Sequence, residues 1–438
     1  MNVQKGTSSL LIAALTLTTA ACGTGNTGAK DDGKLPESKS AEQKPVELTW
    51  YHVPADGPVG DAFQQQYGQL IAKKYPNLSF KVLVNKEENT LANVVVSKTN
   101  LDVMLASFAS LPAVKDNGLL GDLSDLVKKH NFDLNRIETA SLDMMRSLDA
   151  GKLVALPLYE LRFVLYYNKD LFDKFGVPYP KNGLTWEEMI DVSKRMTRSE
   201  GGVTYRGYVG PPSNFINANQ YGYDFIDAKT NRAVINSDNW KKIADKFIPI
   251  YTAPGYNAVK EAYGYDLFLK EKSAAMTSAY NSYAATVNAN VPNWDAASFP
   301  EMGDLKGVAS QPYPVVLTVP TTSQHRDEAF QAIAQLLTDE VQQERASKLA
   351  FLAPLKNPDV KSAFARDVAD WKGKNISAVT AQKGPKTIAY NQYNTSAAAA
   401  IGNAMMAVID GSKDINTALR EEEEKLNKQI TADEAAKK

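Results

Sequence analysis

The sequence predicts an α/β protein in which parallel strands alternate with helices. Strands are expected at residues 47–53, 78–84 and 101–105, where β-branched and aromatic residues end at turn signals. Between them, apolar side chains recur at helical spacing over residues 59–75 and more weakly over 88–98. Strand, helix, strand, helix, strand indicates a parallel sheet with right-handed crossovers. A length of 438 residues allows two or three domains of this kind.

The alternation continues along the chain, and a second α/β unit is expected in its middle. Further strands are expected at residues 163–168, 273–277 and 315–319, and further helices at residues 169–175, 185–196, 237–251, 327–337, 395–410 and 414–430. The helix at 185–196 has the sharpest start, because Thr185 and Glu188 have the spacing of a capping box. Ligands of open parallel sheets bind outside the carboxyl ends of the strands, here residues 50–56 and 106–110.

Composition excludes several function classes. The 49 Lys and Arg residues balance 50 Asp and Glu residues, whereas a nucleic-acid-binding domain normally shows a basic excess. A single Cys rules out intrachain disulfides, Cys-rich zinc sites and iron–sulfur clusters. The three His residues, His52, His130 and His325, are far apart in sequence and form no HExxH motif. We therefore expect no metal and no cofactor.

The first residues have the pattern of an export signal. Lys5 precedes a short apolar run, Leu10 to Leu17, which gives way to small residues before Cys22. The run is too short for the ~20 residues that a membrane-spanning helix needs. Leu17-Thr-Thr-Ala-Ala-Cys22 resembles a bacterial lipobox, which implies cleavage before Cys22 and lipidation of that residue. The alternative is an ordinary signal peptide followed by a buried free Cys.

Residues 22–45 are polar and small, and we expect them to form a flexible tether with a root-mean-square reach of roughly 27 Å. Two nucleotide-binding patterns in this tether are rejected. Gly23 to Gly28 matches GxGxxG, and Gly28 to Lys34 nearly matches a phosphate-binding loop. Both motifs require a preceding strand and a following helix, and the tether offers neither.

A set of strings in the body of the chain resembles a known family. The most specific run includes Gly151-Lys152, Leu156-Pro157, Leu165-Tyr-Tyr-Asn-Lys-Asp-Leu-Phe172, Phe175-Gly176, Pro178 and Thr185-Trp-Glu-Glu188, and supporting strings lie at residues 101–103, 118–123, 270–276 and 315–346. In order and spacing they resemble the solute-binding proteins of carbohydrate ABC importers, the maltose-binding-protein-like group. The resemblance covers residues 45–430.

The resemblance implies a type II periplasmic-binding-protein-like fold, with two discontinuous α/β lobes, a hinge and an interlobe ligand cleft. Lobe 1 is expected at residues 46–157 and 316–352, and lobe 2 at 163–312 and 358–430, with hinge crossings at 157–163, 312–316 and 352–358. Ligand capture in such proteins closes the lobes by a hinge motion.

A saccharide needs aromatic platforms for its C–H faces and polar groups for its hydroxyls. Residues 159–283 hold 14 of the 20 Tyr residues, which favours a Tyr-lined face on lobe 2, although core packing is the alternative for each Tyr.

Alignment with the ligand loops of the family implies twelve contact residues: Tyr51 and Asp56 after the first strand; Ser107, Phe108 and Ser110 after the third; Glu160 and Arg162 in the first crossing; Tyr221, Tyr223 and Asp224 in a loop; and Asn281 and Tyr283 after the strand at 273–277. Relatives often carry a Trp where Ala106 stands, so Phe108 would have to replace that platform or else cap the core. Each of the twelve also has a structural alternative, such as a core position or an ordinary turn.

Glu160 and Arg162 are the only charged residues between Pro157 and Tyr167, and two interpretations stay open. Arg162 could hold the carboxylate of a uronic acid through two parallel hydrogen bonds. Alternatively, Arg162 pairs with Glu160 as part of the hinge, and the ligand is neutral.

The leading functional hypothesis is therefore a monomeric, lipid-anchored binding protein on the extracellular side of the cell membrane. It would capture a sugar or oligosaccharide for the permease subunits of an ABC importer without catalysing a reaction. A binding lipoprotein for a non-sugar solute is the first alternative. A secreted carbohydrate-active hydrolase or lyase is the second, and it would require paired carboxylates that flank the scissile bond.

Overall fold

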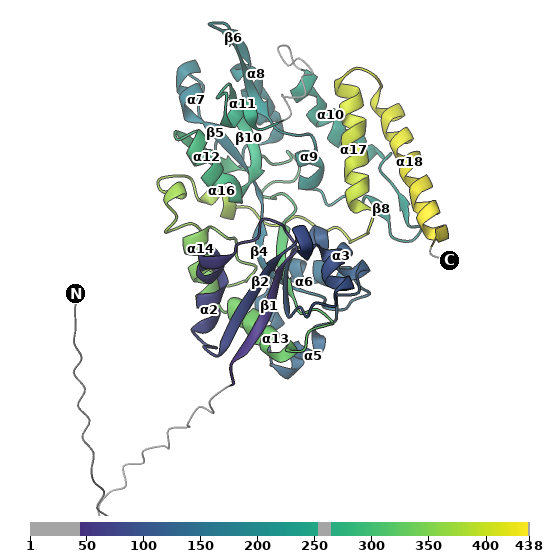
Figure 1. Cartoon of the computed structure of the whole chain (residues 1–438). Coiled ribbons are helices and arrows are strands. Elements are labelled where there is room, and N and C mark those ends of the chain that lie inside the picture. The colour runs from purple at the N-terminus through teal and green to yellow at the C-terminus, as the bar shows by residue number, and fades with distance from the viewer. Residues whose placement is uncertain (1–43, 253–263, 437–438) are drawn as a thin grey trace, which may run out of the picture. The chain divides into compact units, whose positions relative to one another are not determined.

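The computed structural model describes residues 44–252 and 264–436. The predicted signal peptide, Cys22 and the tether as far as residue 43 lie outside the described residues, as do Tyr256 and Tyr263. The described residues belong to one compact unit. The described part contains two five-stranded sheets and a short hairpin, and helices pack around the sheets (Figure 1).

The first sheet has the strand order β2-β1-β3-β12-β4. Its strands are β1 (Val46–His52), β2 (Leu78–Val84), β3 (Val103–Ser107), β4 (Leu156–Leu161) and β12 (Tyr313–Thr318). β1 pairs in parallel with β2 and β3, which confirms the predicted parallel unit, whereas β12 is antiparallel to β3 and β4. The carboxyl ends of β1, β3 and β4 therefore lie at the same edge as the start of β12.

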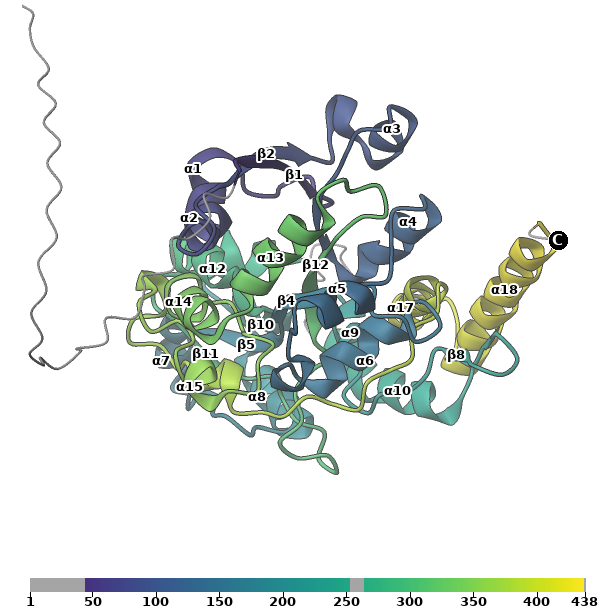
Figure 2. The same cartoon turned by 90° about the horizontal axis from the view of Figure 1, so that it is seen from below.

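Helices cover both faces of the first sheet around one hydrophobic core. They are α1 (Gly60–Phe63), α2 (Gln69–Ala72), α3 (Leu91–Val96), α4 (Leu111–Asp116), α5 (Ser124–Lys129), α6 (Thr139–Ser147), α13 (Arg326–Leu336) and α14 (Asp339–Leu349). The view from below shows α2, α13 and α14 on one side of the sheet and α4 and α6 on the other (Figure 2). The helix predicted at 59–75 is present, with a π-helical segment at Gln64–Gly68 between α1 and α2.

The second sheet has the strand order β11-β5-β10-β7-β6. Its strands are β5 (Phe163–Asn168), β6 (Arg198–Glu200), β7 (Val203–Val209), β10 (Ala274–Tyr280) and β11 (Trp294–Ser298). β10 runs parallel to β7 and antiparallel to β5. Consequently β7 and β10 end at the edge where β5 begins. A separate hairpin joins β8 (Ile226–Asp227) to β9 (Arg232–Ala233).

Two cores pack against the two faces of the second sheet, because successive residues of β5 are buried in different clusters. The helices of this part are α7 (Lys169–Phe175), α8 (Trp186–Met196), α9 (Ser213–Ala218), α10 (Asp238–Thr252), α11 (Asp266–Leu269), α12 (Ala284–Asn290), α16 (Ser377–Thr380), α17 (Asn394–Ile409) and α18 (Ile415–Ala436); α15 (Pro358–Ser362) follows α14. α17 and α18 run side by side (Figure 1).

The start of α8 follows from its sequence. The Thr185 side chain accepts a hydrogen bond from the Glu188 backbone N–H, and the Glu188 carboxylate accepts one from the Thr185 backbone N–H, which confirms the predicted capping box. Trp186, the first residue of the helix, is fully buried and donates its indole N–H to Gln220. Trp186 is therefore a packing residue of the second part's core.

The first passage of the chain between the two sheets takes a single residue, because only Arg162 separates β4 from β5. Asn281 braces this crossing: its side-chain oxygen accepts the Arg162 backbone N–H at 2.9 Å, and its amide nitrogen donates to the Ala350 carbonyl at 3.3 Å. The predicted boundaries of lobes and hinge crossings stay predictions. Among the residues that the structure describes, no helix is both long enough and apolar enough to cross a membrane.

Candidate ligand cleft

In α/β proteins, ligands bind at the carboxyl ends of the strands. In this chain, those ends of the two sheets face each other. The first sheet contributes Phe108, which follows β3, and Tyr313, which begins β12. The second contributes Tyr280, the last residue of β10, and Pro212, which follows β7. All four residues line one cavity of about 630 Å³, within the ~300–1,000 Å³ typical of small-molecule sites. We call this cavity the cleft.

Helices of both parts close the walls of the cleft. Met144 of α6 lies on the side of the first sheet, and Asn217 of α9 lies on the side of the second. α17 supplies most of one wall, and the segment that precedes it adds Ile388 and Tyr390. The other lining residues are Ala109, Pro112, Ser213, Phe225, Gln311, Pro312, Pro314, Asn391, Gln392, Asn394, Thr395, Ala398, Ala399, Gly402, Asn403 and Met406.

Two aromatic pairs line the cleft. Phe108 meets Tyr390 edge to face, with ring centroids 5.9 Å apart. Tyr280 and Tyr313 contact each other with centroids 5.5 Å apart and tilted rings. All four side chains are half-buried, so each keeps part of its surface open to the cavity. Each pair can therefore present a ring surface to the C–H face of a ligand.

The polar groups of the cleft are neutral. In the described part of the chain, the hydroxyls of Tyr280, Tyr313 and Tyr390 make no hydrogen bond, and the same is true of the side chains of Asn217 and Thr395. Burial raises the pKa of Tyr280, with smaller contributions from Tyr313 and Tyr265, and burial followed by Asp116 raises the pKa of Tyr390 to about 12. Both hydroxyls therefore keep their protons near neutral pH and can donate hydrogen bonds to a ligand.

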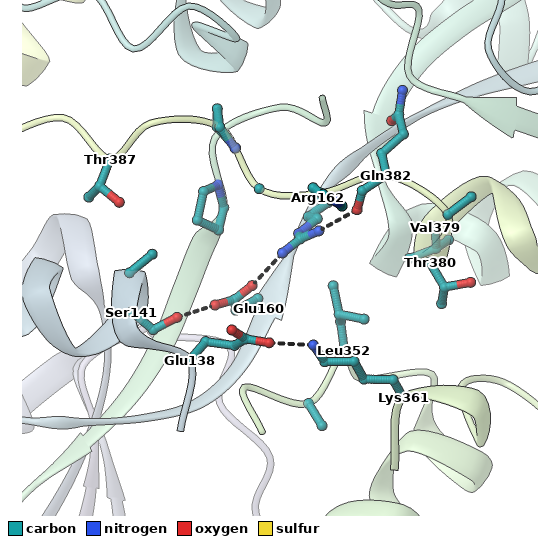
Figure 3. Close-up of a pocket in the computed structure, with 17 residues that line it drawn as sticks. Glu138, Ser141, Glu160, Arg162, Leu352, Lys361, Val379, Thr380, Gln382 and Thr387 are labelled. Atoms are coloured by element: carbon teal, nitrogen blue, oxygen red, sulfur yellow. Dashed lines mark hydrogen bonds and ion pairs between the residues drawn. The ribbon is translucent and has the colours of Figure 1, made fainter. Parts of the chain in front are cut away.

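Figure 3 shows a second cavity, of about 390 Å³, which shares the lining residue Pro312 with the cleft. In it the Glu160 carboxylate accepts from the Ser141 hydroxyl and from the Arg162 guanidinium, the latter at 3.2 Å. Arg162 also donates to the Gln382 carbonyl at 3.3 Å. We call it the hinge cavity, because β4 crosses to β5 within its wall.

A second ion pair lines the hinge cavity, between Glu138 and Lys361 (Figure 3). Both carboxylates of this cavity thus have a cationic partner. Of the two interpretations that the sequence left open for Arg162, the structure contains the pair with Glu160.

Among the predicted contact residues, Phe108 alone lines the cleft, whereas Glu160 and Arg162 line the hinge cavity. Tyr51 is fully buried and donates its hydroxyl to the Asn89 carbonyl at 2.8 Å. Burial also raises its pKa to about 12. Asp56 is exposed in the turn after β1. As contact residues, these positions stay predictions.

Ser107 and Ser110 hydrogen-bond to each other beside Phe108, which fixes the short turn after β3. Asn281 is fully buried, and the hydrogen bonds described above occupy its amide. Tyr283 is 36% exposed and contacts Tyr265. None of these four residues lines either cavity.

The loop with Tyr221, Tyr223 and Asp224 lies outside both cavities. The two Tyr rings stack with centroids 4.9 Å apart, and the Tyr221 hydroxyl donates to Asp304 at 2.5 Å. Asp224 is exposed, and its backbone carbonyl accepts the indole N–H of Trp240. This arrangement fixes the loop against the second part of the chain.

Sequence reasoning missed Tyr280, Tyr313 and Tyr390. Tyr280, which lines the cleft, directly precedes Asn281, the residue predicted from sequence at this turn. Tyr313 stands between two prolines in a segment that was predicted only as a hinge crossing. Tyr390 lies in an irregular segment where no periodicity indicates an element. Of the described Tyr residues in 159–283, only Tyr280 lines the cleft, and Tyr166, Tyr208 and Tyr251 are core residues.

Two sheets with facing strand ends and a cleft between them define a two-lobed binding protein, which confirms the predicted fold class. The family of bacterial extracellular solute-binding proteins matches residues 55–343, and the chain belongs to this family. The prediction of the family is thereby confirmed.

Individual relatives are distant. A mannitol-binding protein of Pseudomonas aeruginosa is 24% identical over 211 residues, which are 44% of this chain. The chain spans less than half the length of that relative, 46%.

Solved structures agree over nearly the whole fold. An ABC substrate-binding protein of Listeria monocytogenes in complex with cycloalternan superposes with a TM-score of 0.70 at 19% identity, covering 89% of this chain and 100% of the other. The cyclic alpha-maltosyl-1,6-maltose binding protein of Arthrobacter globiformis gives a TM-score of 0.71 at 18% identity, covering 88% and 99%.

Proposed function

We propose that this chain is the substrate-binding lipoprotein of an ABC importer and captures a sugar or oligosaccharide in the cleft. The observation that carries the proposal is that two aromatic pairs, one of which joins the two sheets, line one cavity of about 630 Å³. Aromatic faces suit the C–H surfaces of a saccharide, and the free Tyr hydroxyls suit its hydroxyl rim. In this proposal, the lobes have the boundaries predicted from sequence and close on the ligand by a hinge motion.

The names of the similar proteins support a saccharide. The two similar structures belong to proteins described as bound to cycloalternan and as binding cyclic maltosyl-maltose, and the curated relative is named for mannitol. A non-sugar solute is the alternative within the same family.

The proposal assigns no reaction to the chain. A glycosidase requires two carboxyl groups that flank the scissile bond. Among the described residues, none that lines the cleft is an Asp or Glu. The hinge cavity holds Glu138 and Glu160, but Lys361 and Arg162 neutralise them. This pattern favours binding over hydrolysis.

Calorimetric titration with a panel of neutral disaccharides and trisaccharides tests the proposal. At least one should bind, and Phe108→Ala and Tyr280→Ala should each weaken it by roughly tenfold or more, about 1.4 kcal/mol. Tyr179→Ala is the matched control, because Tyr179 is an exposed aromatic residue that lines neither cavity. If ligands recovered from cells and identified by mass spectrometry were exclusively peptides or polyamines, the sugar assignment would be wrong.

We also propose that lipid on Cys22 anchors the chain to the cell membrane and that the body faces the extracellular side, where the permease subunits receive the ligand. Cys22→Ser should move the protein from the membrane fraction to the soluble fraction with unchanged ligand affinity. Membrane retention of the variant would contradict lipid anchoring through this residue.

A further inference from the structure

The two cavities differ in the charge of the side chains that line them. The hinge cavity is lined by Glu138, Glu160, Arg162, Lys361 and Lys383. Pro312 also lines the cleft, and none of the described residues that line the cleft is an Asp, Glu, Lys, Arg or His. The neutral lining therefore contrasts with charged groups a short distance away.

The guanidinium of Arg162, at the crossing between the sheets, already has hydrogen-bond partners. Arg162 donates to Glu160 and to the Gln382 carbonyl, and only 17% of its side chain is exposed. Its backbone N–H is also used, by Asn281. Turning this side chain into the cleft would leave the carboxylate of Glu160, whose side chain is only 4% exposed, without its cationic partner.

From this separation we infer that the cleft binds an uncharged saccharide of at least two rings and excludes sugars that carry a carboxylate or a phosphate. The inference rests on the proposed function and names the substrate class of that same site. A ligand carboxylate in the cleft would lose water and meet only neutral donors, such as the hydroxyls of Tyr280, Tyr313 and Tyr390. Burying a charge without a partner is strongly unfavourable, whereas neutral hydroxyls can pair with these donors.

The length of the ligand follows from the two aromatic pairs. Phe108 with Tyr390 and Tyr280 with Tyr313 provide two separate ring surfaces in one cavity. A single sugar ring can use one of them, and a disaccharide or longer chain can use both.

The test is calorimetric titration of the full mature chain with maltose, cellobiose, mannobiose and galactobiose and their trisaccharides, each beside the derivative with one primary alcohol oxidised to a carboxylate. The best neutral ligand should bind at least roughly 30-fold more tightly than its acidic derivative and at least roughly tenfold more tightly than the monosaccharide. The inference would be overturned if an acidic derivative bound as tightly as its neutral parent. It would also be overturned if a monosaccharide bound as tightly as the best neutral oligosaccharide.

A variant with an added cation sharpens the test. Asn217 is exposed at the cleft, and its side chain makes no hydrogen bond within the described residues. Asn217→Lys should tighten binding of the acidic derivative by roughly tenfold, because it supplies the missing counter-charge. Ala432→Lys, on the exposed side of α18, adds the same net charge away from the cleft and should change nothing.

If Asn217→Lys left the affinity for the acidic derivative unchanged, this would contradict the assignment of the cleft as the ligand site. Binding of acidic oligosaccharides alone would overturn the inference but keep the proposed function. Binding of no saccharide at all, with peptides or polyamines recovered from cells instead, would overturn both.

Discussion

Glu160 and Arg162 form an ion pair, at 3.2 Å, at the point where the chain leaves the first sheet for the second, because Glu160 belongs to β4 and Arg162 is the one residue between β4 and β5. Ser141 of α6 holds the carboxylate from one side, and the Gln382 carbonyl holds the guanidinium from the other. Gln382 in turn donates to the Phe299 carbonyl and to Glu301. A continuous set of polar contacts thus joins α6 of the first part to residues around β11 of the second.

Removing one partner of this pair should destabilise the chain. Arg162→Leu leaves the carboxylate of Glu160 buried without its cation, and we expect a loss of about 2–4 kcal/mol in the free energy of unfolding. The double variant Glu160→Gln/Arg162→Leu should recover part of that loss. Urea denaturation measures both. Lys270→Met removes an exposed pair with Asp266 and should change the free energy by less than about 0.5 kcal/mol. Strictly additive single-variant effects would contradict a coupled pair.

Asn281 should act through the hinge and not through the ligand. Asn281→Leu leaves the Arg162 N–H and the Ala350 carbonyl without their partner, which should cost about 2–4 kcal/mol of stability. Asn290→Ala is the control: Asn290 is the half-buried last residue of α12, and its side chain only donates to the Thr286 carbonyl of the same helix at an exposed site, so its loss should be nearly neutral. Thermal and urea unfolding measure the difference. Unchanged stability with a large loss of ligand affinity would instead favour the ligand contact predicted from sequence.

His52 should make stability depend on pH. Its side chain is fully buried, and burial lowers its pKa from 6.5 to about 4, with the Pro58 carbonyl and Asp56 opposing the shift. Between these two values the unfolded chain binds the proton and the folded chain does not, so stability falls as pH falls from 6.5 toward 4. The full loss in the free energy of unfolding from this group is about 3 kcal/mol. Denaturation of wild type and His52→Phe at several pH values should show a shallower decline in the variant; identical slopes would rule out this contribution.

Gly207 should tolerate no side chain. A Cβ at this position would lie 2.0 Å from the Ser193 carbonyl oxygen, which belongs to the backbone of α8. Gly207→Ala should therefore cost about 3 kcal/mol, because β7 and α8 would have to separate. Gly303→Ala is the matched control, since its Cβ would lie 3.5 Å from a flexible Glu187 oxygen. Equal melting temperatures for the two variants would show that the backbone adapts.

The sequence predicted the local elements well because their signals are local. The strands β1, β2 and β3, whose alternation with helices predicted the parallel pairing, and the capping box at Thr185 all have signals in neighbouring residues. The cleft was harder, because it joins residues that are distant in sequence. Alternation along β10 cannot tell whether Tyr280 or Asn281 faces the cavity, since the strand ends between them. Tyr390 contacts Phe108 from an irregular segment, and no periodicity or spacing in the sequence predicts that contact.

The shared wall at Pro312 offers a way to follow ligand capture optically. Because the chain has a single Cys, at position 22, Thr380→Cys in a chain that starts after this residue creates a unique thiol. A fluorescent dye on that thiol would occupy the hinge cavity and leave the cleft free. A rearrangement of Pro312 by a ligand on one side would change the surroundings of the dye on the other. The two cavities would thus turn the protein into a sensor of its ligand, with a reporter that does not compete with the ligand for the cleft.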